Sequence, residues 1–199
     1  MRAQLVGEHA VLVTCADSAE VRAVYADLRS AGLGAVEVVP AARTVLLDGL
    51  ADPESVLDVL TDRQVPVLDT TADTAEVVLD VRYDGPDLDE VARQWDVSTA
   101  EVVRIHRTAT FVVDFCGFAP GFAYCTGLPD GLTVRRRTEP RTAVPAGSVA
   151  LAGEYTGVYP TASPGGWQLI GRTDTVLWRP DADPPALLTP GTRVRFRDV

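Results

Sequence analysis

Lysine is absent from this chain, and all 18 of its basic residues are arginine. This absence excludes a P-loop, which needs the lysine of its GK[ST] motif to hold phosphate groups. It also excludes a Schiff-base lysine and a biotinyl-lysine. A nucleotide or biotin, if the protein uses one, is therefore bound by another route or supplied by a partner protein.

Cysteine and histidine are scarce. The three cysteines, Cys15, Cys116 and Cys125, form no CxxC pair, and one disulfide would leave one of them over. Buried reduced thiols are therefore expected. Structural zinc takes about four Cys or His ligands at tight spacing. Because His9 and His106 are the only histidines, we expect no metal site.

Long apolar runs are missing as well. No stretch approaches the roughly 20 apolar residues of a membrane span, and residues 1–10 lack the apolar segment of a signal peptide. The formal net charge of −10 argues against a nucleic-acid role, which needs a positive surface to neutralise phosphates. We therefore expect a soluble cytoplasmic protein that binds neither membranes nor nucleic acid.

Residues 10–83 alternate between strand-like and helix-like patterns. Asp17 or Ser18 can cap a helix that stops at Gly32, and Pro53 can open a second helix. Strands are predicted for residues 9–15, 35–39, 44–47 and 76–83. The resulting order, β-α-β-β-α-β, is that of a ferredoxin-like unit. The first domain is therefore predicted to be a small ferredoxin-like α+β domain over residues 1–83.

Residues 84–199 follow a different pattern after a break at residues 85–86. Two short helices come first, one capped by Asp87 and one opened by a capping box of Ser98 and Glu101. Short strands separated by Gly and Pro turns are then predicted for residues 111–115, 132–134, 148–151, 157–159, 167–170, 176–178 and 193–196. Many short strands with little helix favour a closed β-barrel. The whole chain is thus predicted to be α+β, with its second domain over residues 84–199.

Four glycine-rich segments of the second domain also contain aromatic and hydroxyl residues: 117–124, 140–153, 156–167 and 169–173. Glycine lets a ligand approach the backbone closely, and its amide can point at an anion. Between Arg141 and Arg172 the only acidic residue is Glu154, so an anion would be tolerated there. The residue types alone favour a second interpretation, in which these segments are tight turns of the barrel.

Several side chains of this domain are candidates for chemistry. His106 follows Val102 and Val103 by one helical turn, so it can be a buried structural histidine or a catalytic one. Ser148 and Ser163 lie outside any G-x-S-x-G elbow. Hydrogen bonding to a ligand or a turn is therefore favoured over a serine triad.

Arginines are the candidate anion ligands. Arg141 and Arg172 can clamp a carboxylate or phosphoryl group with their planar guanidinium groups, or can hold the barrel together through salt bridges. The arginine run at residues 135–137 is interpreted as a solvated face or a partner contact rather than as part of a site.

Four segments together resemble one known family: GFAPGFAYCTGLP, PRTAVPAGSVALAG, TGVYPTASPGGWQLIGRT and LTPGTRVRFRDV. They are similar to the KipI family, also called allophanate hydrolase subunit 1, most strongly from residue 83 to residue 199. The resemblance implies an α+β N-terminal domain followed by a cyclophilin-like β-barrel. Cys125 and Val134 depart from the family's usual leucine and proline, and the barrel is expected to tolerate both.

The activity that this resemblance implies is an ATP-dependent 5-oxoprolinase, which converts 5-oxoproline, ATP and water to glutamate. The chain would act with a carboxylase-like partner of the allophanate hydrolase subunit 2 type and with a LamB/YcsF-type protein. ATP would be shared with the partner, and biotin is not expected on this chain. The family leaves two alternatives: a KipI-type inhibitor of a histidine kinase, and the carboxyltransferase half of a urea- or allophanate-processing enzyme.

The resemblance also implies the residues of a site for a small anionic substrate. His106 would transfer or orient a proton, while Arg141 and Arg172 would clamp the anion in catalysis. The expected substrate-binding residues are Gly147, Ser148, Tyr159, Ser163, Gly165, Gly166, Trp167 and Thr173. No metal ligand is expected among them.

Overall fold

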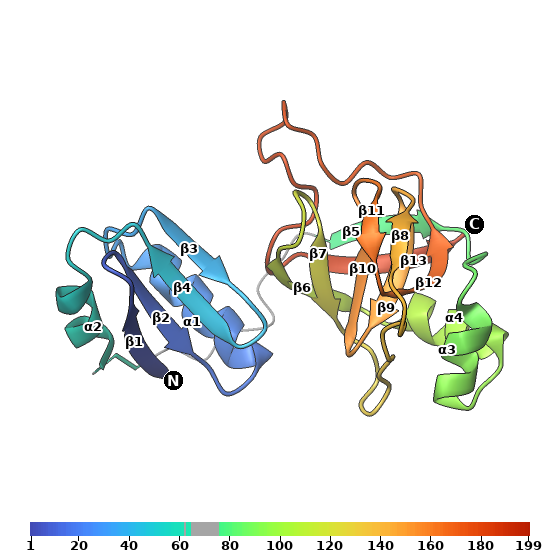
Figure 1. The fold of residues 1–199 in the computed structure, drawn as a ribbon, viewed down its shortest axis with the longest axis horizontal. Helices are drawn as coiled ribbons and strands as arrows, with labels where there is room; N and C mark the ends of the chain where they lie inside the picture. Colours follow the sequence, from blue (N-terminus) through green and yellow to red (C-terminus); the bar gives the residue numbers. More distant parts are fainter. Residues whose placement is uncertain (62, 65–75) are drawn as a thin grey trace. The chain divides into compact units, whose positions relative to one another are not determined.

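The chain forms two compact units, Met1–Asp73 and Thr74–Val199. The structure is a computed structural model, and it describes residues 1–61, 63–64 and 76–199. Figure 1 shows that each unit has its own β-sheet and its own helices. Each also has its own hydrophobic core.

The first unit is an antiparallel four-stranded sheet with two helices. Its strands follow the spatial order β1-β2-β4-β3. The elements are β1 (Arg2–Val6), β2 (Ala10–Thr14), α1 (Ser18–Ser30), β3 (Glu37–Pro40), β4 (Thr44–Asp48) and α2 (Pro53–Thr61). Alternate residues of the central strands, among them Val11, Val13, Val45 and Leu47, are fully buried. This period of two is what a sheet with one covered face requires.

Helix α1 begins where the sequence supplies a cap. The Asp17 carboxylate accepts a hydrogen bond from the Glu20 amide at 2.8 Å, which satisfies one of the free N–H groups of the first turn. Val21, Val24 and Leu28 fall on one face of the helix and are buried in the core of the unit. Burial of this apolar face holds the helix against the sheet.

The first unit lacks one strand of the predicted ferredoxin-like order. Residues 76–83 are expected to close this unit, but β5 (Glu76–Val81) pairs in parallel with β13 (Arg193–Asp198) in the second unit. The sheet position beside β2 is filled instead by β1. The two strands form a hairpin through a turn at Gly7, where φ is 61°. A hairpin closes a short loop, so it costs less chain entropy than a distant strand.

The second unit is built on a seven-stranded sheet that curls into a barrel, with the spatial order β12-β9-β10-β7-β6-β13-β5. Its other strands are β6 (Phe111–Cys116), β7 (Ala123–Thr126), β9 (Ser148–Ala152), β10 (Tyr155–Val158) and β12 (Gln168–Arg172), while β8 (Arg141–Val144) and β11 (Ser163–Gly165) pair with each other. The two ends of the sheet meet at Arg82 and Arg172, whose backbones exchange two hydrogen bonds of 2.9 Å. Such a bridge protects the sheet edges at that point. The predicted α+β class with a barrel-like second unit is confirmed.

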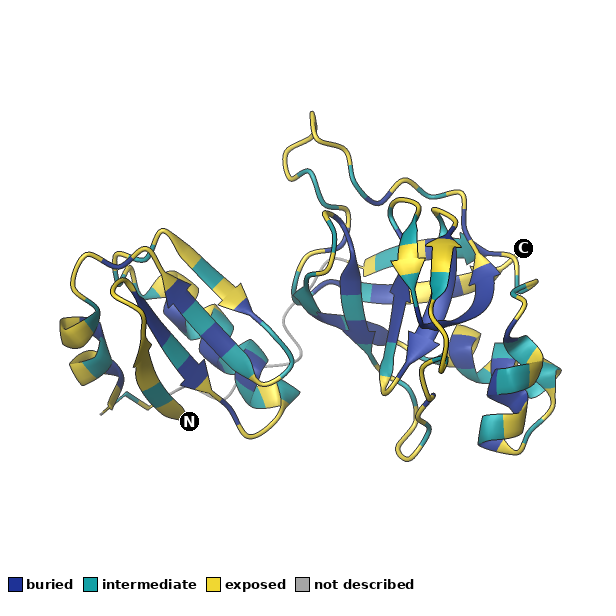
Figure 2. Ribbon diagram, in the orientation of Figure 1, coloured by how far each residue is buried: buried dark blue, intermediate teal, exposed yellow. Residues whose placement is uncertain are grey.

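Helices α3 (Leu88–Trp95) and α4 (Thr99–Thr108) pack their apolar residues into the core of this unit. Ser98 caps α4 by accepting a hydrogen bond from the Glu101 amide at 3.2 Å. The Glu101 carboxylate pairs with Arg104 instead of completing the capping box. Figure 2 shows that buried residues concentrate in the strands of the barrel. Of the helices in the described ranges, none is long and apolar enough to cross a membrane.

Candidate functional site

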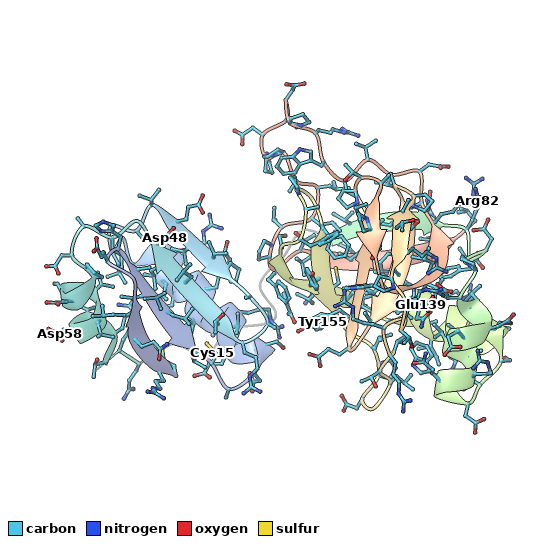
Figure 3. All side chains as sticks on the ribbon, viewed as in Figure 1. Cys15, Asp48, Asp58, Arg82, Glu139 and Tyr155 are labelled. Atoms are coloured by element: carbon cyan, nitrogen blue, oxygen red, sulfur yellow. The ribbon has the colours of Figure 1, made fainter. Side chains whose placement is uncertain are left out.

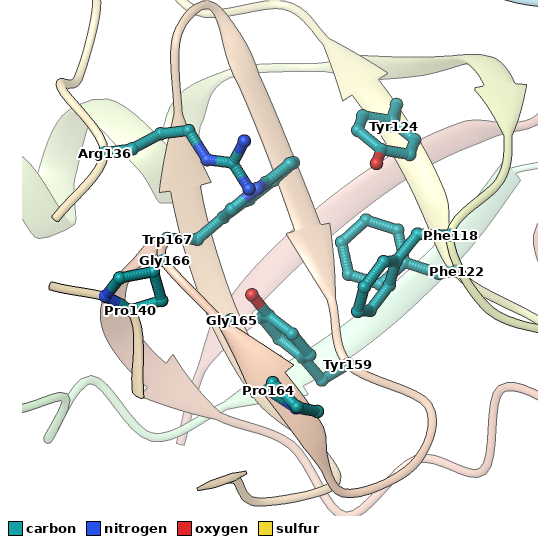
Figure 4. A pocket seen from close by; sticks show the side chains of 10 residues that line it. All are labelled: Phe118, Phe122, Tyr124, Arg136, Pro140, Tyr159, Pro164, Gly165, Gly166 and Trp167. Atoms are coloured by element: carbon teal, nitrogen blue, oxygen red, sulfur yellow. The ribbon is translucent and has the colours of Figure 1, made fainter. Parts of the chain in front are cut away.

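A small pocket lies on the second unit where several glycine-rich and aromatic segments meet (Figure 4). Its volume is about 190 Å³, which is below the roughly 300–1,000 Å³ of pockets for drug-sized ligands. The lining residues are Phe118, Phe122, Tyr124, Arg136, Pro140, Tyr159, Pro164, Gly165, Gly166 and Trp167. The pocket therefore suits a molecule of about one ring in size.

Aromatic rings form most of this pocket. Phe122 is buried and meets Tyr159 and Trp167 edge to face, with ring centroids 5.2 and 5.3 Å apart. Tyr124 meets Trp167 at 5.4 Å and Tyr155 of the neighbouring strand β10 at 5.7 Å. Figure 3 labels Tyr155 among the side chains of the second unit. Each such pair contributes about 0.5–1.5 kcal/mol beyond simple burial. The rings support one another, so the pocket has a defined shape without a ligand.

Three polar groups converge on the aromatic pocket. Figure 4 shows the Arg136 guanidinium beside Trp167, with the hydroxyls of Tyr124 and Tyr159 directed toward the middle of the pocket. Burial raises the pKa of both phenols, while the Arg136 charge acts in the opposite direction on each. Both tyrosines are therefore neutral hydrogen-bond donors near pH 7. Because its described lining residues include one cation and no carboxylate, the pocket is suited to a small anion.

The segment GFAPGF places two of these rings. Phe122 N–H donates to the Ala119 carbonyl at 3.0 Å, and between them Pro120 is followed by Gly121 with φ of 82°. Proline followed by a residue of positive φ is the pattern of a type II turn. The Gly117 amide then bonds to the Phe122 carbonyl at 3.2 Å. The turn thus fixes the loop at the start of β7.

Gly165 lets Tyr159 occupy its place in the pocket. A Cβ atom at position 165 would lie 2.2 Å from the Tyr159 hydroxyl oxygen. Burial raises the pKa of the Tyr159 phenol, and the backbone of Trp167 acts against that rise by hydrogen bonding to the same oxygen. Any larger residue at 165 would therefore displace one of the converging polar groups.

The structure brings together only part of the predicted substrate-binding set. Tyr159, Gly165, Gly166 and Trp167 line the pocket. Ser163 lies on the same strand β11 but is not among the lining residues, and its hydroxyl is a buried atom without a hydrogen-bond partner in the described ranges. Four of the eight expected residues therefore share one site.

Gly147, Ser148 and Thr173 lie outside the pocket, contrary to expectation. The Gly147 amide donates to the Tyr159 carbonyl at 2.7 Å, and its carbonyl accepts from the Thr173 amide at 2.8 Å. The Ser148 hydroxyl donates to the Pro145 carbonyl at 2.8 Å. The Gly147 bonds join the ends of neighbouring strands, and the Ser148 bond closes a local turn.

His106 lies inside the barrel, fully buried and away from the pocket, which does not fit its predicted role in proton transfer. The Thr156 hydroxyl donates to the Ala150 carbonyl at 3.3 Å and so accepts from His106 Nε2 at 2.9 Å. His106 Nδ1 then accepts from the Tyr83 hydroxyl at 2.8 Å. This pattern assigns the tautomer. Burial lowers the imidazole pKa to about 3, so the side chain is a neutral structural link.

The second unit is expected to lose stability as the pH falls below 6.5, the usual pKa of histidine, because His106 takes up a proton in the unfolded chain but not in the fold. Between pH 7 and 5 the loss should approach about 1 kcal/mol per pH unit. Urea unfolding followed by tryptophan fluorescence measures it, since all three tryptophans lie in this unit. His106→Gln should flatten the slope and His9→Gln should keep it. Equal slopes in the two variants would contradict this account.

Arg141 belongs to an ion cluster and does not line the pocket, contrary to expectation. Its Nη2 lies 2.8 Å from the buried carboxylate of Asp87. The same carboxylate holds Arg137 at 3.2 Å and accepts a hydrogen bond from the Leu169 amide at 2.7 Å. Asp87 thereby joins the start of α3 to β8 and β12. Arg141 takes part in this link through Nη2, while its Nη1 is a buried atom without a hydrogen-bond partner in the described ranges.

Arg172 is also placed differently from the prediction. Its guanidinium pairs with Asp84 at 2.7 Å on the surface, beside the backbone bridge that closes the barrel. Arg136 is the cation that faces the pocket instead. No ion pair or hydrogen bond of Arg136 occurs among the residues that the structure describes.

Six lining residues are not predicted from the sequence: Phe118, Phe122, Tyr124, Arg136, Pro140 and Pro164. The three aromatic ones lie in segment 117–124, which stands out for its glycine and aromatic content. Arg136 lies in the run at 135–137, which the sequence pattern marks as a solvated face. One signal in the sequence could have pointed to Arg136. The run at 135–137 contains more arginines than nearby acidic residues can neutralise, so one arginine is left to face a site.

These features define a class of protein: a two-unit α+β chain whose barrel-like sheet carries a small aromatic pocket with one cation. No cluster of three or more His, Cys, Asp or Glu side chains suited to a metal occurs within the described residues. The family described as carboxyltransferase domain, subdomain C and D, matches residues 1–188, and the chain belongs to it. The family resemblance inferred from the sequence motifs is confirmed by this match and by the relatives below.

Curated relatives share the matching part of the chain at high identity. The chain is 54% identical over 112 residues to the B subunit of 5-oxoprolinase from Escherichia coli O157:H7, covering 56% of this chain and 51% of that protein. It is 49% identical over 112 residues to the corresponding 5-oxoprolinase protein of Bacillus subtilis strain 168, covering 56% and 47%. The chain thus spans about half the length of the curated relatives it matches.

A solved structure shows the same fold. The crystal structure of the protein TTHA0988 superposes with a TM-score of 0.77 at 33% sequence identity. The alignment covers 96% of this chain and 39% of that protein. Both units of the chain therefore have counterparts in a larger protein.

Proposed function

We propose that this chain is a subunit of an ATP-dependent 5-oxoprolinase and that its aromatic pocket binds 5-oxoproline. The observation that carries the proposal is the pocket itself, which offers one guanidinium within aromatic walls and is sized for a single ring. The two curated relatives named as 5-oxoprolinase components support the same substrate. 5-Oxoproline is a five-membered lactam that carries one carboxylate, so it matches the pocket in size and charge.

The chemistry of the pocket assigns a part of the substrate to each group. The Arg136 guanidinium binds the substrate carboxylate through charge-assisted hydrogen bonds. The hydroxyls of Tyr124 and Tyr159 face the ring and can donate to the lactam oxygen. The ring lies against Phe122 and Trp167, which exclude water from the side that they cover. The chain thereby binds and orients the lactam.

Opening the lactam needs energy, because an amide is a poor electrophile near neutral pH. Transfer of the γ-phosphoryl group of ATP to the lactam oxygen makes the ring carbon electrophilic. Water then adds to that carbon and the ring C–N bond breaks, which leaves γ-glutamyl phosphate. A second water hydrolyses this acyl phosphate, so the products are glutamate, ADP and phosphate. Tyr124 and Tyr159 are placed to steady the oxygen on which charge develops.

We assign the ATP-binding site to a partner subunit or to an interface that the chain shares with it. The pocket of about 190 Å³ is too small for ATP, and the chain has no lysine for a P-loop. The proposed partners are a carboxylase-like second subunit of the allophanate hydrolase subunit 2 type and a LamB/YcsF-type protein. The proposed catalytic site is then composite.

Co-expression of the chain with both proposed partners tests this function. We expect glutamate release from 5-oxoproline that requires ATP and stops when any one of the three proteins is left out. The products are measured by an enzymatic glutamate assay together with phosphate release. The proposal is contradicted if a purified complex of all three proteins binds 5-oxoproline but forms no glutamate when ATP is added.

A second function is favoured by the family description, which names a carboxyltransferase domain. In that case the chain would be half of a carboxyltransferase acting on urea or allophanate, and its complex would contain a biotinylated protein. Avidin separates the two functions. It should abolish a biotin-dependent carboxyl transfer and leave ATP-dependent glutamate release unchanged.

A further inference from the structure

Phe118 has a backbone conformation that is unfavourable for its residue type. Its φ is 71°, and in the described ranges Asp96 is the only other non-glycine residue with a positive φ. The Ala119 amide bonds to the Gly117 carbonyl at 2.8 Å across Phe118, which closes a three-residue γ-turn. A γ-turn with positive φ is rare and strained, and a bulky side chain there is an outlier.

Burial of the side chain does not offset this cost, because 61% of Phe118 is exposed. The ring makes two edge-to-face contacts, with Phe122 at 5.4 Å and with Tyr159 at 6.2 Å. Both of these rings line the pocket. Figure 4 shows Phe118 across the pocket from Arg136. The residue therefore contributes more to the pocket than to the core.

The loop keeps this ring in a fixed position. The γ-turn runs directly into the type II turn of residues 119–122, and the Gly117 amide bonds back to the Phe122 carbonyl at 3.2 Å. At position 121 a Cβ atom would lie 2.8 Å from Trp178 Cβ, so the loop is also packed tightly behind the turn. Strain that the surrounding structure enforces in this way is typical of ligand-binding sites.

On the basis of the proposed function, we propose that Phe118 is a specificity-determining residue. Its fixed ring stacks on a flat cyclic carboxylate whose charge Arg136 holds at the other side of the pocket. An open-chain amino acid offers no flat ring to Phe118 and adds charges for which the described lining residues supply no partner. The pocket therefore selects the cyclic substrate 5-oxoproline over glutamate, and release of the product follows from the same preference.

Calorimetric titration of the 199-residue chain with 5-oxoproline, benzoate and glutamate tests this inference. In wild type we expect binding of the two cyclic carboxylates and at least tenfold weaker binding of glutamate. Phe118→Gly should weaken the binding of both cyclic carboxylates about tenfold, because the stacking contact is lost. Phe118→Tyr keeps a ring and should bind them within about threefold of wild type.

Thermal unfolding separates a binding role from a structural one. Phe118→Gly should unfold at the same temperature as wild type or a higher one, because glycine adopts positive φ without strain. Asp96→Gly is the matched control, since Asp96 ends α3 with a φ of 54° and does not line the pocket. It should relieve the same kind of strain and leave binding unchanged.

The possible results separate this inference from the proposed function. If wild type binds 5-oxoproline and Phe118→Gly binds it equally well, the specificity role is wrong and the function stands. If wild type binds benzoate but not 5-oxoproline, and the binding depends on Phe118, the function is wrong and only the role of Phe118 in binding flat cyclic carboxylates stands. Failure of wild type to bind either cyclic carboxylate, alone or in its assembled complex, overturns both.

Discussion

Replacing Asp87 with alanine should destabilise the second unit by about 3–5 kcal/mol, the range for a buried ion pair that loses one partner. The Asp87 carboxylate is only 6% exposed and receives Arg137, Arg141 and the Leu169 amide. Without it, two guanidinium groups lose their counter-charge and a buried amide loses its acceptor. Asp87→Asn keeps an oxygen for the amide but not the charge, so it should cost less than alanine.

Urea unfolding followed by tryptophan fluorescence measures this loss in the second unit alone, because Trp95, Trp167 and Trp178 all lie there. Asp84→Ala is the control. It removes an ion pair whose two side chains are 50% and 58% exposed, and exposed pairs contribute about 0–1 kcal/mol. If Asp87→Ala and Asp84→Ala lowered the free energy of unfolding equally, the buried ion pairs of Asp87 would contribute no more to stability than an exposed pair.

Replacing Arg136 with glutamine should weaken 5-oxoproline binding about a hundredfold. A hydrogen bond to a charged group contributes about 1.5–3 kcal/mol, and the glutamine amide cannot neutralise a carboxylate. Since Arg136 is exposed and has no ion-pair partner in the described ranges, the variant should unfold as wild type does. Titration calorimetry gives the affinity, and kcat/KM of the assembled enzyme should fall in parallel.

Two further variants sharpen this test. Arg135→Gln removes the same charge from the neighbouring position, which lies outside the pocket, and should leave binding within about twofold of wild type. Arg136→Lys keeps the charge but not the planar fork, so its affinity should fall between those of wild type and the glutamine variant. Wild-type affinity in Arg136→Gln would show that the carboxylate is bound elsewhere.

Local signals in the sequence locate the helices well. Asp17 and Ser98 cap α1 and α4 as predicted, and α2 begins at Pro53. A cap is a contact between residues three apart, so the sequence near it contains all the required information. Asp87 precedes α3 as expected, but its side chain makes no capping bond because two arginines and a strand amide take up the carboxylate.

Strand positions are harder to predict where pairing decides them. Residues 132–134 and 176–178 make only isolated bridges, at Val134 and Trp178. Strands β1, β7, β8 and β11 are absent from the sequence-based prediction, although each has a partner in the structure. Short segments become strands when a neighbour supplies hydrogen bonds, and that neighbour is often distant in the sequence.

The region of the candidate site is predictable, but its cation is not. Glycine and aromatic content select the segments that hold Tyr159 and Trp167, two residues that line the pocket. Whether Arg136 or Arg141 faces the pocket depends on Asp87, which binds Arg141 from 54 positions earlier in the chain. A sequence pattern reports that arginines are present and does not report which of them are already neutralised.

The position of β13 between β6 and β5 has a consequence for how the chain folds during translation. Asp80 of β5 meets its partner Arg197 only after 117 further positions have left the ribosome. All strands of the first unit's sheet lie within residues 2–48, so this sheet can form as soon as it emerges. The barrel can close only when β13 is inserted, so nascent chains should carry a folded first unit joined to an unfinished second one.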